Sequence, residues 1–256
     1  MNIAVTTIRE AEESLIYKAK IIAEELDIAY IKRENFSIEK VILKEEVDYL
    51  LVVEKHKLVI RGLDSTLFWH PNMSELKIKS IRQGNKETII EATKLEEGSS
   101  ILDCTLGLAG DSLVFSTIVG KSGVVVGTEI NKYIAYLTKK GLENYIDNET
   151  EIKVINESYK KYLLKQDDNS FDVVYFDPMF KEPNKKSTTI NSFRNFADHK
   201  GINKEILNEA LRVCKKRVVV KERRGYNDFK NLGIEKCYGG KKDGSIIYGV
   251  IEKEIV

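Results

Sequence analysis

The residues best placed to do chemistry are four in a row, Asp177-Pro178-Met179-Phe180, at the end of the apolar run 171–180. Because this run is rich in Val, Tyr and Phe, it predicts a buried strand of a parallel sheet. Open α/β sheets bind their ligands at the carboxyl ends of such strands. There, the Asp177 carboxylate and the Pro178 carbonyl oxygen could accept hydrogen bonds from a planar amine, and Phe180 could stack on its ring.

A second set of residues predicts a cofactor site. The segment 101–112 has the pattern of a strand, a glycine-containing loop and a helix start, and its glycines let the backbone approach a ligand closely. Glu129 ends the next predicted strand, 19 residues after Gly110, where an acid accepts hydrogen bonds from two ribose hydroxyls. Asp103 stands directly before the loop, where the ammonium group of an amino acid would need it. The plainer interpretations are a helix-capping acid for Asp103 and a surface acid for Glu129.

Together these features favour S-adenosylmethionine over a dinucleotide as the cofactor. S-adenosylmethionine carries a ribose, an adenine and an amino-acid tail, which match the two acids and the loop. The loop lacks the G-x-G-x-x-G pattern of dinucleotide sites, and the sequence shows no series of hydrogen-bond donors that could bind a pyrophosphate. Residues 156–159 follow the third strand and should cover the adenine, although Ser158 would serve equally well as a helix cap.

These residues need a doubly wound, mostly parallel sheet to bring them together. Alternating strands and helices, the pattern of such a sheet with right-handed crossovers, begin at about residue 100. Predicted strands lie at 100–105, 123–130, 151–156, 171–177 and 217–222, with a final pair near 234–239 and 245–252. Predicted helices lie at about 111–119, 131–145, 158–165, 188–198 and 203–214.

The pattern divides the chain into a small N-terminal α/β domain (1–73), a helical connector (74–98) and a main domain (99–256). The small domain is predicted to hold strands at 1–7, 28–33 and 65–70, helices at 9–26 and 37–43, and a hairpin over 48–62. The connector is predicted to form two short helices interrupted at Gly84-Asn85. Since no catalytic group stands out before residue 74, the small domain is expected to position the substrate or to form a dimer contact.

The composition, 42% hydrophobic and 32% charged, is typical of a soluble globular protein. No apolar stretch reaches the roughly 18 residues that span a bilayer, and the N-terminus lacks the pattern of a signal peptide, so a cytoplasmic location is expected. The three cysteines and three histidines are scattered without metal-ligand spacing. Reduced cysteines and no metal site are therefore predicted.

Basic residues gather directly downstream of Asp177. Residues 181–224 contain 13 Lys/Arg and 5 Asp/Glu, a balance of +8, whereas the whole chain has a net charge of +1. This excess predicts either a solvated basic face or a rim that contacts RNA phosphates. The candidate phosphate-binding residues are Lys181, Lys221, Arg223 and Arg224.

Four segments, 82–95, 101–112, 177–180 and 216–221, together resemble the bacterial 16S ribosomal RNA guanine-N2 methyltransferases. The similarity runs from about residue 50 to the C-terminus. It implies a Rossmann-like class I methyltransferase sheet with an antiparallel last strand, and methyl transfer from S-adenosylmethionine to the exocyclic amine of a guanine in ribosomal RNA. This chain has Ala-Gly-Asp at 109–111 where the family has Gly-Arg-Asp, and Lys181 where the family has proline.

The resemblance also assigns site residues. It places donor contacts on Gly110, Asp111, Glu129, Ile130, Ser158, Tyr159 and Asp177, to which the loop adds Asp103, Thr105 and Gly107, and the third strand end adds Glu157. Asp177, Pro178 and Phe180 would hold an extruded base for in-line attack on the methyl group. Two other interpretations stay open: an N-methyltransferase for a small molecule or protein, and a non-catalytic S-adenosylmethionine-binding protein.

Overall fold

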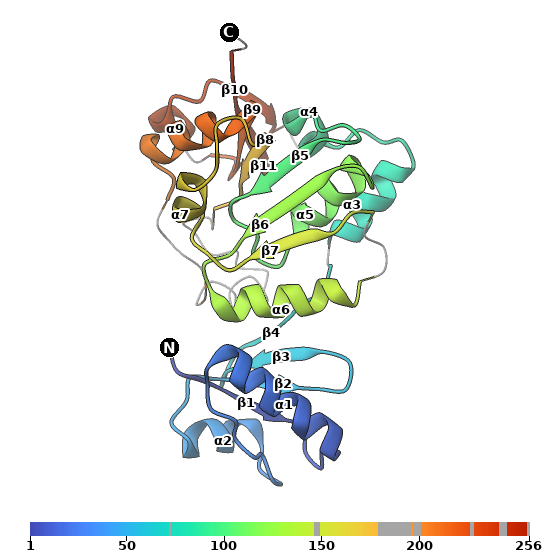
Figure 1. Cartoon of the computed structure of the whole chain (residues 1–256), viewed down its shortest axis with the longest axis vertical. Helices are drawn as coiled ribbons and strands as arrows, with labels where there is room; N and C mark the ends of the chain where they lie inside the picture. The colour runs from blue at the N-terminus through green and yellow to red at the C-terminus, as the bar shows by residue number, and fades with distance from the viewer. Residues whose placement is uncertain are drawn as a thin grey trace. The chain divides into compact units, whose positions relative to one another are not determined.

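A computed structural model describes residues 1–71, 73–145, 149–178, 196, 201–225, 228–240 and 245–254. These residues form two compact units, one built on residues 1–70 and the other beginning at Pro71 (Figure 1). Helices α3 (Met73–Arg82) and α4 (Thr88–Thr93), predicted as a connector, belong to the second unit. The three-domain division itself stays a prediction.

The first unit contains a four-stranded sheet in the order β1-β2-β3-β4. Its strands are β1 (Ile3–Thr7), β2 (Tyr49–Val53), β3 (Leu58–Arg61) and β4 (Thr66–Phe68), and its helices are α1 (Glu13–Leu26) and α2 (Ile38–Lys44). Ser37 caps α2, because its side chain accepts a hydrogen bond from Lys40 N at 3.2 Å. The predicted strand 28–33 is wrong: only Tyr30 forms a bridge, to Val5.

The second unit contains a seven-stranded sheet in the order β10-β11-β9-β8-β5-β6-β7. The strands are β5 (Ser100–Asp103), β6 (Val124–Thr128), β7 (Ile152–Ile155), β8 (Phe171–Phe176), β9 (Cys214–Arg223), β10 (Lys236–Gly239) and β11 (Ile246–Glu252). Strands β5 to β9 pair in parallel, and β11 is antiparallel to both of its neighbours. The predicted fold class, a mostly parallel sheet with an antiparallel last strand, is confirmed.

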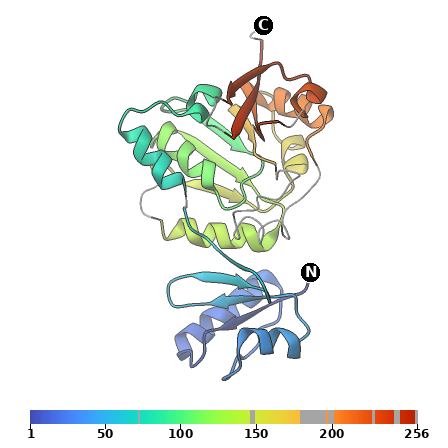
Figure 2. The same ribbon diagram turned by 180° about the vertical axis from the view of Figure 1, so that it is seen from behind.

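Helices cover both faces of this sheet (Figures 1 and 2). They are α5 (Gly110–Val119), α6 (Lys132–Glu143), α7 (Tyr159–Leu164), α9 (Lys204–Val213) and α10 (Asp228–Leu232), together with α3 and α4. Strand β8 shows why both faces must be covered. Val174 and Phe176 join an apolar cluster with α9, while Tyr175 points to the other face and packs edge-on against Phe115 of α5. The predicted helix 188–198 lies outside the described residues.

The order of the strands indicates at which edge of the sheet a ligand would bind. Strand β5 lies between β8 and β6, at the point where the chain reverses its progress across the sheet. Ligands of doubly wound sheets bind at this switch point, beyond the carboxyl ends of the strands. The residues that follow β5, β6, β7, β8 and β9 therefore meet at one edge. In the described part of the chain, no helix is long and apolar enough to cross a membrane.

Candidate functional site

The loop after β5 is tethered to both neighbouring strands. Cys104 N donates to the Tyr175 carbonyl oxygen at 2.9 Å, and Leu106 N donates to the Thr128 carbonyl oxygen at 3.0 Å. Close packing on β6 is possible because Gly127 has no side chain: a Cβ there would lie 2.4 Å from Leu106 Cδ1. The loop then passes through Gly107, whose φ of 52° favours glycine, and leads into α5.

The Glu129 carboxylate lies against this loop. Its Oε2 accepts a hydrogen bond from Gly107 N at 3.2 Å, and its Oε1 accepts one from Asn131 N at 2.8 Å. Behind it, the Asn156 amide donates to the Glu129 carbonyl oxygen at 2.8 Å. A strand-end acid oriented in this way beside a glycine loop has the chemistry to bind the hydroxyls of a ribose.

Asp103 is turned into the protein. It is 2% exposed and accepts hydrogen bonds from the Ser112 hydroxyl at 2.7 Å and from Thr105 N at 3.0 Å. Burial raises its pKa to about 7, to which the nearby charges of Asp111 and Asp177 contribute. Asp103 thus joins the end of β5 to the start of α5, and its expected contact with a donor ammonium group stays a prediction.

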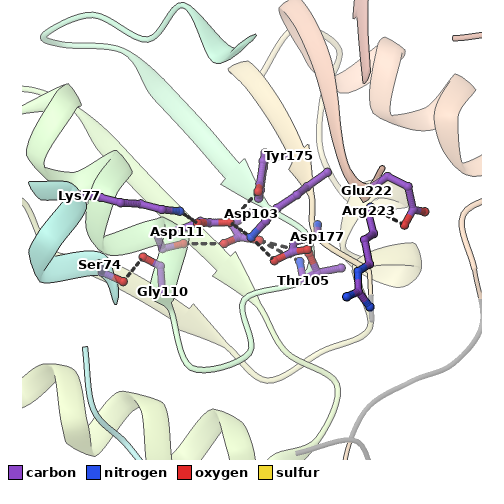
Figure 3. A network of polar contacts seen from close by, with 12 residues as sticks. Ser74, Lys77, Asp103, Thr105, Gly110, Asp111, Tyr175, Asp177, Glu222 and Arg223 are labelled. Carbon is purple, nitrogen blue, oxygen red and sulfur yellow. Dashed lines mark hydrogen bonds and ion pairs between the residues drawn. The ribbon is translucent and has the colours of Figure 1, made fainter. Parts of the chain in front are cut away.

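A charged network lies beside the loop (Figure 3). Lys221 Nζ is 2.7 Å from Asp111 Oδ2 and 2.7 Å from Asp177 Oδ2. Asp111 also accepts from Lys77 Nζ at 3.1 Å and from the Tyr175 hydroxyl at 2.7 Å. Four elements of the second unit, α3, α5, β8 and β9, therefore converge on two carboxylates.

Asp177 is held to the loop as well as to Lys221. Its backbone N donates to Thr105 Oγ1 at 2.5 Å, which links the end of β8 to the loop after β5. On the other side of the loop, the Ser74 hydroxyl of α3 donates to the Gly110 carbonyl oxygen at 2.6 Å. Both contacts use side chains to hold the backbone, at Asp177 on one side of the loop and at Gly110 on the other.

The ion pairs of this network shift the pKa values of its charged residues. Burial alone would lower the pKa of Lys221, but the Asp111 and Asp177 carboxylates hold it well above its ordinary value. Burial alone would raise the pKa of Asp111, but Lys221 and Lys77 hold it well below its usual range. Burial raises the pKa of Asp177 and Asp111 adds to this, while Lys221 opposes them.

The structure places Lys221 and Asp111 differently from the sequence-based expectation. The Lys221 side chain is 14% exposed and faces two carboxylates, so it lies inside the site rather than on a phosphate-contacting rim. Both oxygens of Asp111 accept hydrogen bonds from side chains of the protein. Arg224 is exposed, and Arg223 is half-buried with its guanidinium turned away from Glu222 (Figure 3).

The residues after β6 and β7 have mixed surroundings. Ile130 is exposed, and Glu157 pairs with Lys165 Nζ at 2.5 Å. Ser158 stands at the N-cap of α7 without a capping hydrogen bond from its side chain, and Tyr159 packs edge-on against Phe176. Pro178 is half-buried next to Asp177. The predicted base-stacking Phe180 and the predicted phosphate ligand Lys181 lie outside the described residues.

Sequence reasoning missed Ser74, Lys77 and Tyr175. Tyr175 could have been found, because it stands two residues before Asp177 and alternate residues of a strand share a face. Lys77 carries no such signal, since a lysine on a polar helix ordinarily faces water. In the described part of the chain, no group of three or more His, Cys, Asp and Glu could hold a metal ion.

The comparison with known proteins settles the family. A sequence model of the family described as "Putative SAM-dependent methyltransferase" matches residues 34–248. The chain belongs to the S-adenosylmethionine-dependent methyltransferases. Its cofactor is therefore S-adenosylmethionine. The residues at the ends of β5 and β6 fit this cofactor. The Glu129 carboxylate lies beside a loop whose Gly107, without a side chain, lets a ligand approach the backbone.

Two relatives and one solved structure are similar to this chain. The protein YpiP of Bacillus subtilis (strain 168), described as uncharacterized, is 34% identical over 255 residues, which are 97% of this chain and 98% of YpiP. "Ribosomal RNA small subunit methyltransferase J" of Francisella tularensis subsp. novicida (strain U112) is 30% identical over 175 residues, 64% of this chain and 69% of that protein. A SAM-dependent methyltransferase from Aquifex aeolicus covers 73% of this chain and 100% of its own at a TM-score of 0.43 and 13% identity, too low for the likeness to bear on function.

Proposed function

We propose that this methyltransferase modifies the exocyclic amine of a guanine in small-subunit ribosomal RNA. The observation that carries the proposal is the position of Asp177. Its carboxylate stands at the carboxyl end of β8, and its backbone is bonded to Thr105 of the cofactor loop. A hydrogen-bond acceptor is thereby held next to the place where a methyl donor would bind.

The proposed role of Asp177 follows from the chemistry of the acceptor. The lone pair of an exocyclic amine is delocalised into the base, so the nitrogen is a poor nucleophile. Hydrogen bonds from the amine to the Asp177 carboxylate and the Pro178 carbonyl oxygen would localise and aim that lone pair. Bound S-adenosylmethionine would supply an electrophilic methyl group. The amine nitrogen would form the new carbon–nitrogen bond as the carbon–sulfur bond breaks, and the amine proton would pass to water. A strong base is not required, because the acidity of the amine rises as the bond forms.

The remaining roles are proposed from position. Glu129 binds the ribose, and the backbone at Thr105, Gly107 and Gly110 lines the amino-acid tail of the donor. The residues after β6 and β7, Ile130, Glu157, Ser158 and Tyr159, surround the adenine. Phe180 stacks on the extruded base. Asp103 supports the loop from within, as its hydrogen bonds from Thr105 N and the Ser112 hydroxyl indicate. Asp111 binds Lys221 and Lys77 beside the loop.

An RNA substrate is supported by two independent observations. One relative is named as a ribosomal RNA methyltransferase, and the basic excess in the sequence lies directly after Asp177. Arg223 and Arg224 end and follow β9, where they can reach phosphates. A ribosomal substrate also implies a cytoplasmic location. We propose that residues 1–73 form a separate domain that helps to position this substrate.

The test is methylation of total RNA with labelled S-adenosylmethionine, followed by nucleoside mapping. We expect label in N2-methylguanine of small-subunit RNA, and a loss of about 10²–10³-fold in Asp177→Ala. Asp172→Ala, at the opposite end of β8, is the matched control and should retain transfer. Label only in a metabolite or protein would replace the RNA proposal. Absence of donor binding in calorimetry would instead indicate a protein without this chemistry.

A further inference from the structure

We propose that Lys221 is a positioning residue for methyl transfer, which ties one oxygen of Asp177 to Asp111 and leaves the other oxygen to accept the amine. The inference rests on the proposed function of Asp177. It adds a role for Lys221 that does not follow from that function alone. It replaces the sequence-based expectation that Lys221 binds a phosphate. Three observations carry it: the strand register, the division of hydrogen bonds between the two Asp177 oxygens, and the support behind Lys221.

The register of the sheet brings Lys221 to Asp177. Val220 of β9 lies opposite Phe176, the last residue of β8, so Lys221 and Asp177 follow directly after this pair. Lys221 Nζ binds Asp177 Oδ2, and the structure shows no partner for Oδ1 among the residues it describes. The Asp177 side chain is 31% exposed, which leaves it reachable from outside. One oxygen is thus anchored, and the other can meet a substrate.

Lys221 is itself anchored from behind. Asp111 accepts from Lys221 at 2.7 Å and is in turn held by Lys77 and by the Tyr175 hydroxyl. Because a lysine side chain has four rotatable bonds, a second carboxylate is needed to fix its position. Asp111 stands in the first turn of α5, directly after the cofactor loop. The acceptor acid is therefore positioned from the same helix that follows the donor-binding loop.

The charge of Lys221 matters because acids surround Asp177. Asp103 at the end of β5 and Asp111 on α5 both face it, with Tyr175 of β8 and Tyr248 of β11 nearby and Lys77 of α3 as the other cation. Burial and these like charges favour a protonated Asp177, which would accept the amine poorly. Lys221 opposes them and so favours the ionised carboxylate, the form that accepts a hydrogen bond from the amine.

A double-mutant cycle tests whether Lys221 acts through Asp177. We expect Lys221→Met to lower kcat about 100-fold, the loss typical of a misplaced catalytic group, with the Kd values for S-adenosylmethionine and RNA within about twofold of wild type. Lys221→Arg keeps the charge and should recover about tenfold of that loss. In an Asp177→Asn background, Lys221→Met should cost less than about threefold, because the residue that it positions is already changed. Lys216→Met, near the start of β9, should leave kcat unchanged.

Salt dependence of RNA binding separates this role from a phosphate contact. If Lys221 bound a phosphate, its loss would reduce the slope of log K against log salt by roughly 0.7–0.9. We expect the slope of Lys221→Met to equal that of wild type. A reduced slope, a wild-type kcat, or losses that multiply in the cycle would each overturn the proposal.

A third readout needs no substrate. The ¹³C carboxyl resonance of Asp177 should titrate at least about one pH unit higher in Lys221→Met than in wild type. If Lys221→Met does not fold, Lys221→Gln serves for both measurements. An unmoved titration would reject the inference even if the RNA assignment held. Conversely, if the wild-type protein methylates no RNA but the titration of Asp177 still shifts in Lys221→Met, only the proposed RNA substrate is rejected.

Discussion

The two halves of the site hold their acids in different ways. In the donor half, the ends of β5 and β6, Asp103 and Glu129 accept hydrogen bonds from backbone amides and a hydroxyl. In the acceptor half, the end of β8 and the first turn of α5, Asp177 and Asp111 accept from lysines, and the Tyr175 hydroxyl also donates to Asp111. The donor-half partners lie 2 to 22 residues away, whereas Lys221 lies 44 residues from Asp177 and 110 from Asp111.

The difference shows in two acids eight residues apart. Asp103 and Asp111 are both largely buried, yet burial raises the pKa of Asp103 to about 7, while Lys221 and Lys77 overcome burial and hold the pKa of Asp111 well below its usual range. Burial is thus similar and the cations decide the outcome. Asp103 can therefore lose its charge near neutral pH, whereas Asp111 keeps its charge.

The largest effect is expected from breaking the acceptor half at Asp111. Asp111→Ala should lower the free energy of unfolding by about 3 kcal/mol, because it leaves the buried Lys221 with one carboxylate instead of two. Urea denaturation measures this. The control is Glu157→Ala, which breaks a pair whose lysine is 62% exposed and should cost less than about 1 kcal/mol. Equal losses would show that the network does not stabilise the fold more than a surface ion pair does.

A change in the donor half should affect binding instead. Glu129→Ala should weaken S-adenosylmethionine about 100-fold, or about 2.7 kcal/mol, through loss of the ribose contacts and of the Gly107 anchor. Calorimetry measures the donor Kd, and kcat at saturating donor should stay within about threefold of wild type. Glu143→Ala on the exposed side of α6 is the control. If Lys221→Met bound S-adenosylmethionine more weakly than Glu129→Ala does, the two halves of the site would not have separate roles.

The sequence predicts most of the fold because the fold rests on local patterns. Apolar runs such as 171–176 and 218–220 are typical of strands buried on both faces, and they occur where β8 and β9 form. Segment 28–33 also begins with apolar residues, at 28–31, but it makes one bridge, because its backbone hydrogen bonds to β1 stop after Ala29 and Ile31. Helix α10 was missed, since five residues are too few to show a helical period.

The site is only partly encoded in local patterns. Asp177, Glu129 and the loop were predicted because strand ends of one sheet meet at one edge. The partners of Lys221 could not be, because a lysine near a strand end has the same sequence pattern whether it faces water, a phosphate or a carboxylate. Its direction depends on β9 lying beside β8 and on the first turn of α5 reaching over both.

A pH series sharpens the contrast between the two buried acids. The folded-state pKa of Asp103, about 7, lies above the ordinary value of 3.8, so the folded protein binds this proton more tightly than the unfolded chain. The stabilising contribution of Asp103 is therefore present below pH 4 and is lost as pH rises to 7, by at most about 1.4 kcal/mol per pH unit. Asp103→Asn should flatten this slope in urea denaturation between pH 5 and 7. An identical slope in both proteins would mean that Asp103 stays ionised, as Asp111 does.

The smallest expected effect concerns the backbone of the donor half. Ala109, fully buried at the N-cap of α5, has a φ of 63°, a left-handed conformation that costs an alanine roughly 1–2 kcal/mol. In Ala109→Gly, relief of this strain should roughly offset the lost methyl, about 0.8 kcal/mol, and the greater freedom of unfolded glycine, about 0.5–1 kcal/mol. The matched control is Ala135→Gly, a buried alanine inside α6.

Ala135 is helical, so its replacement incurs both costs without relief and should lower stability by about 1.5 kcal/mol or more. In thermal unfolding, the free energy of unfolding of Ala109→Gly should therefore lie within about 0.5 kcal/mol of the wild-type value. That of Ala135→Gly should lie well below the wild-type value. Equal destabilisation of the two variants would mean that Ala109 is not strained. Near-neutrality at Ala109 alone would show that the loop tolerates a glycine at this position, where the family that the sequence resembles also has glycine.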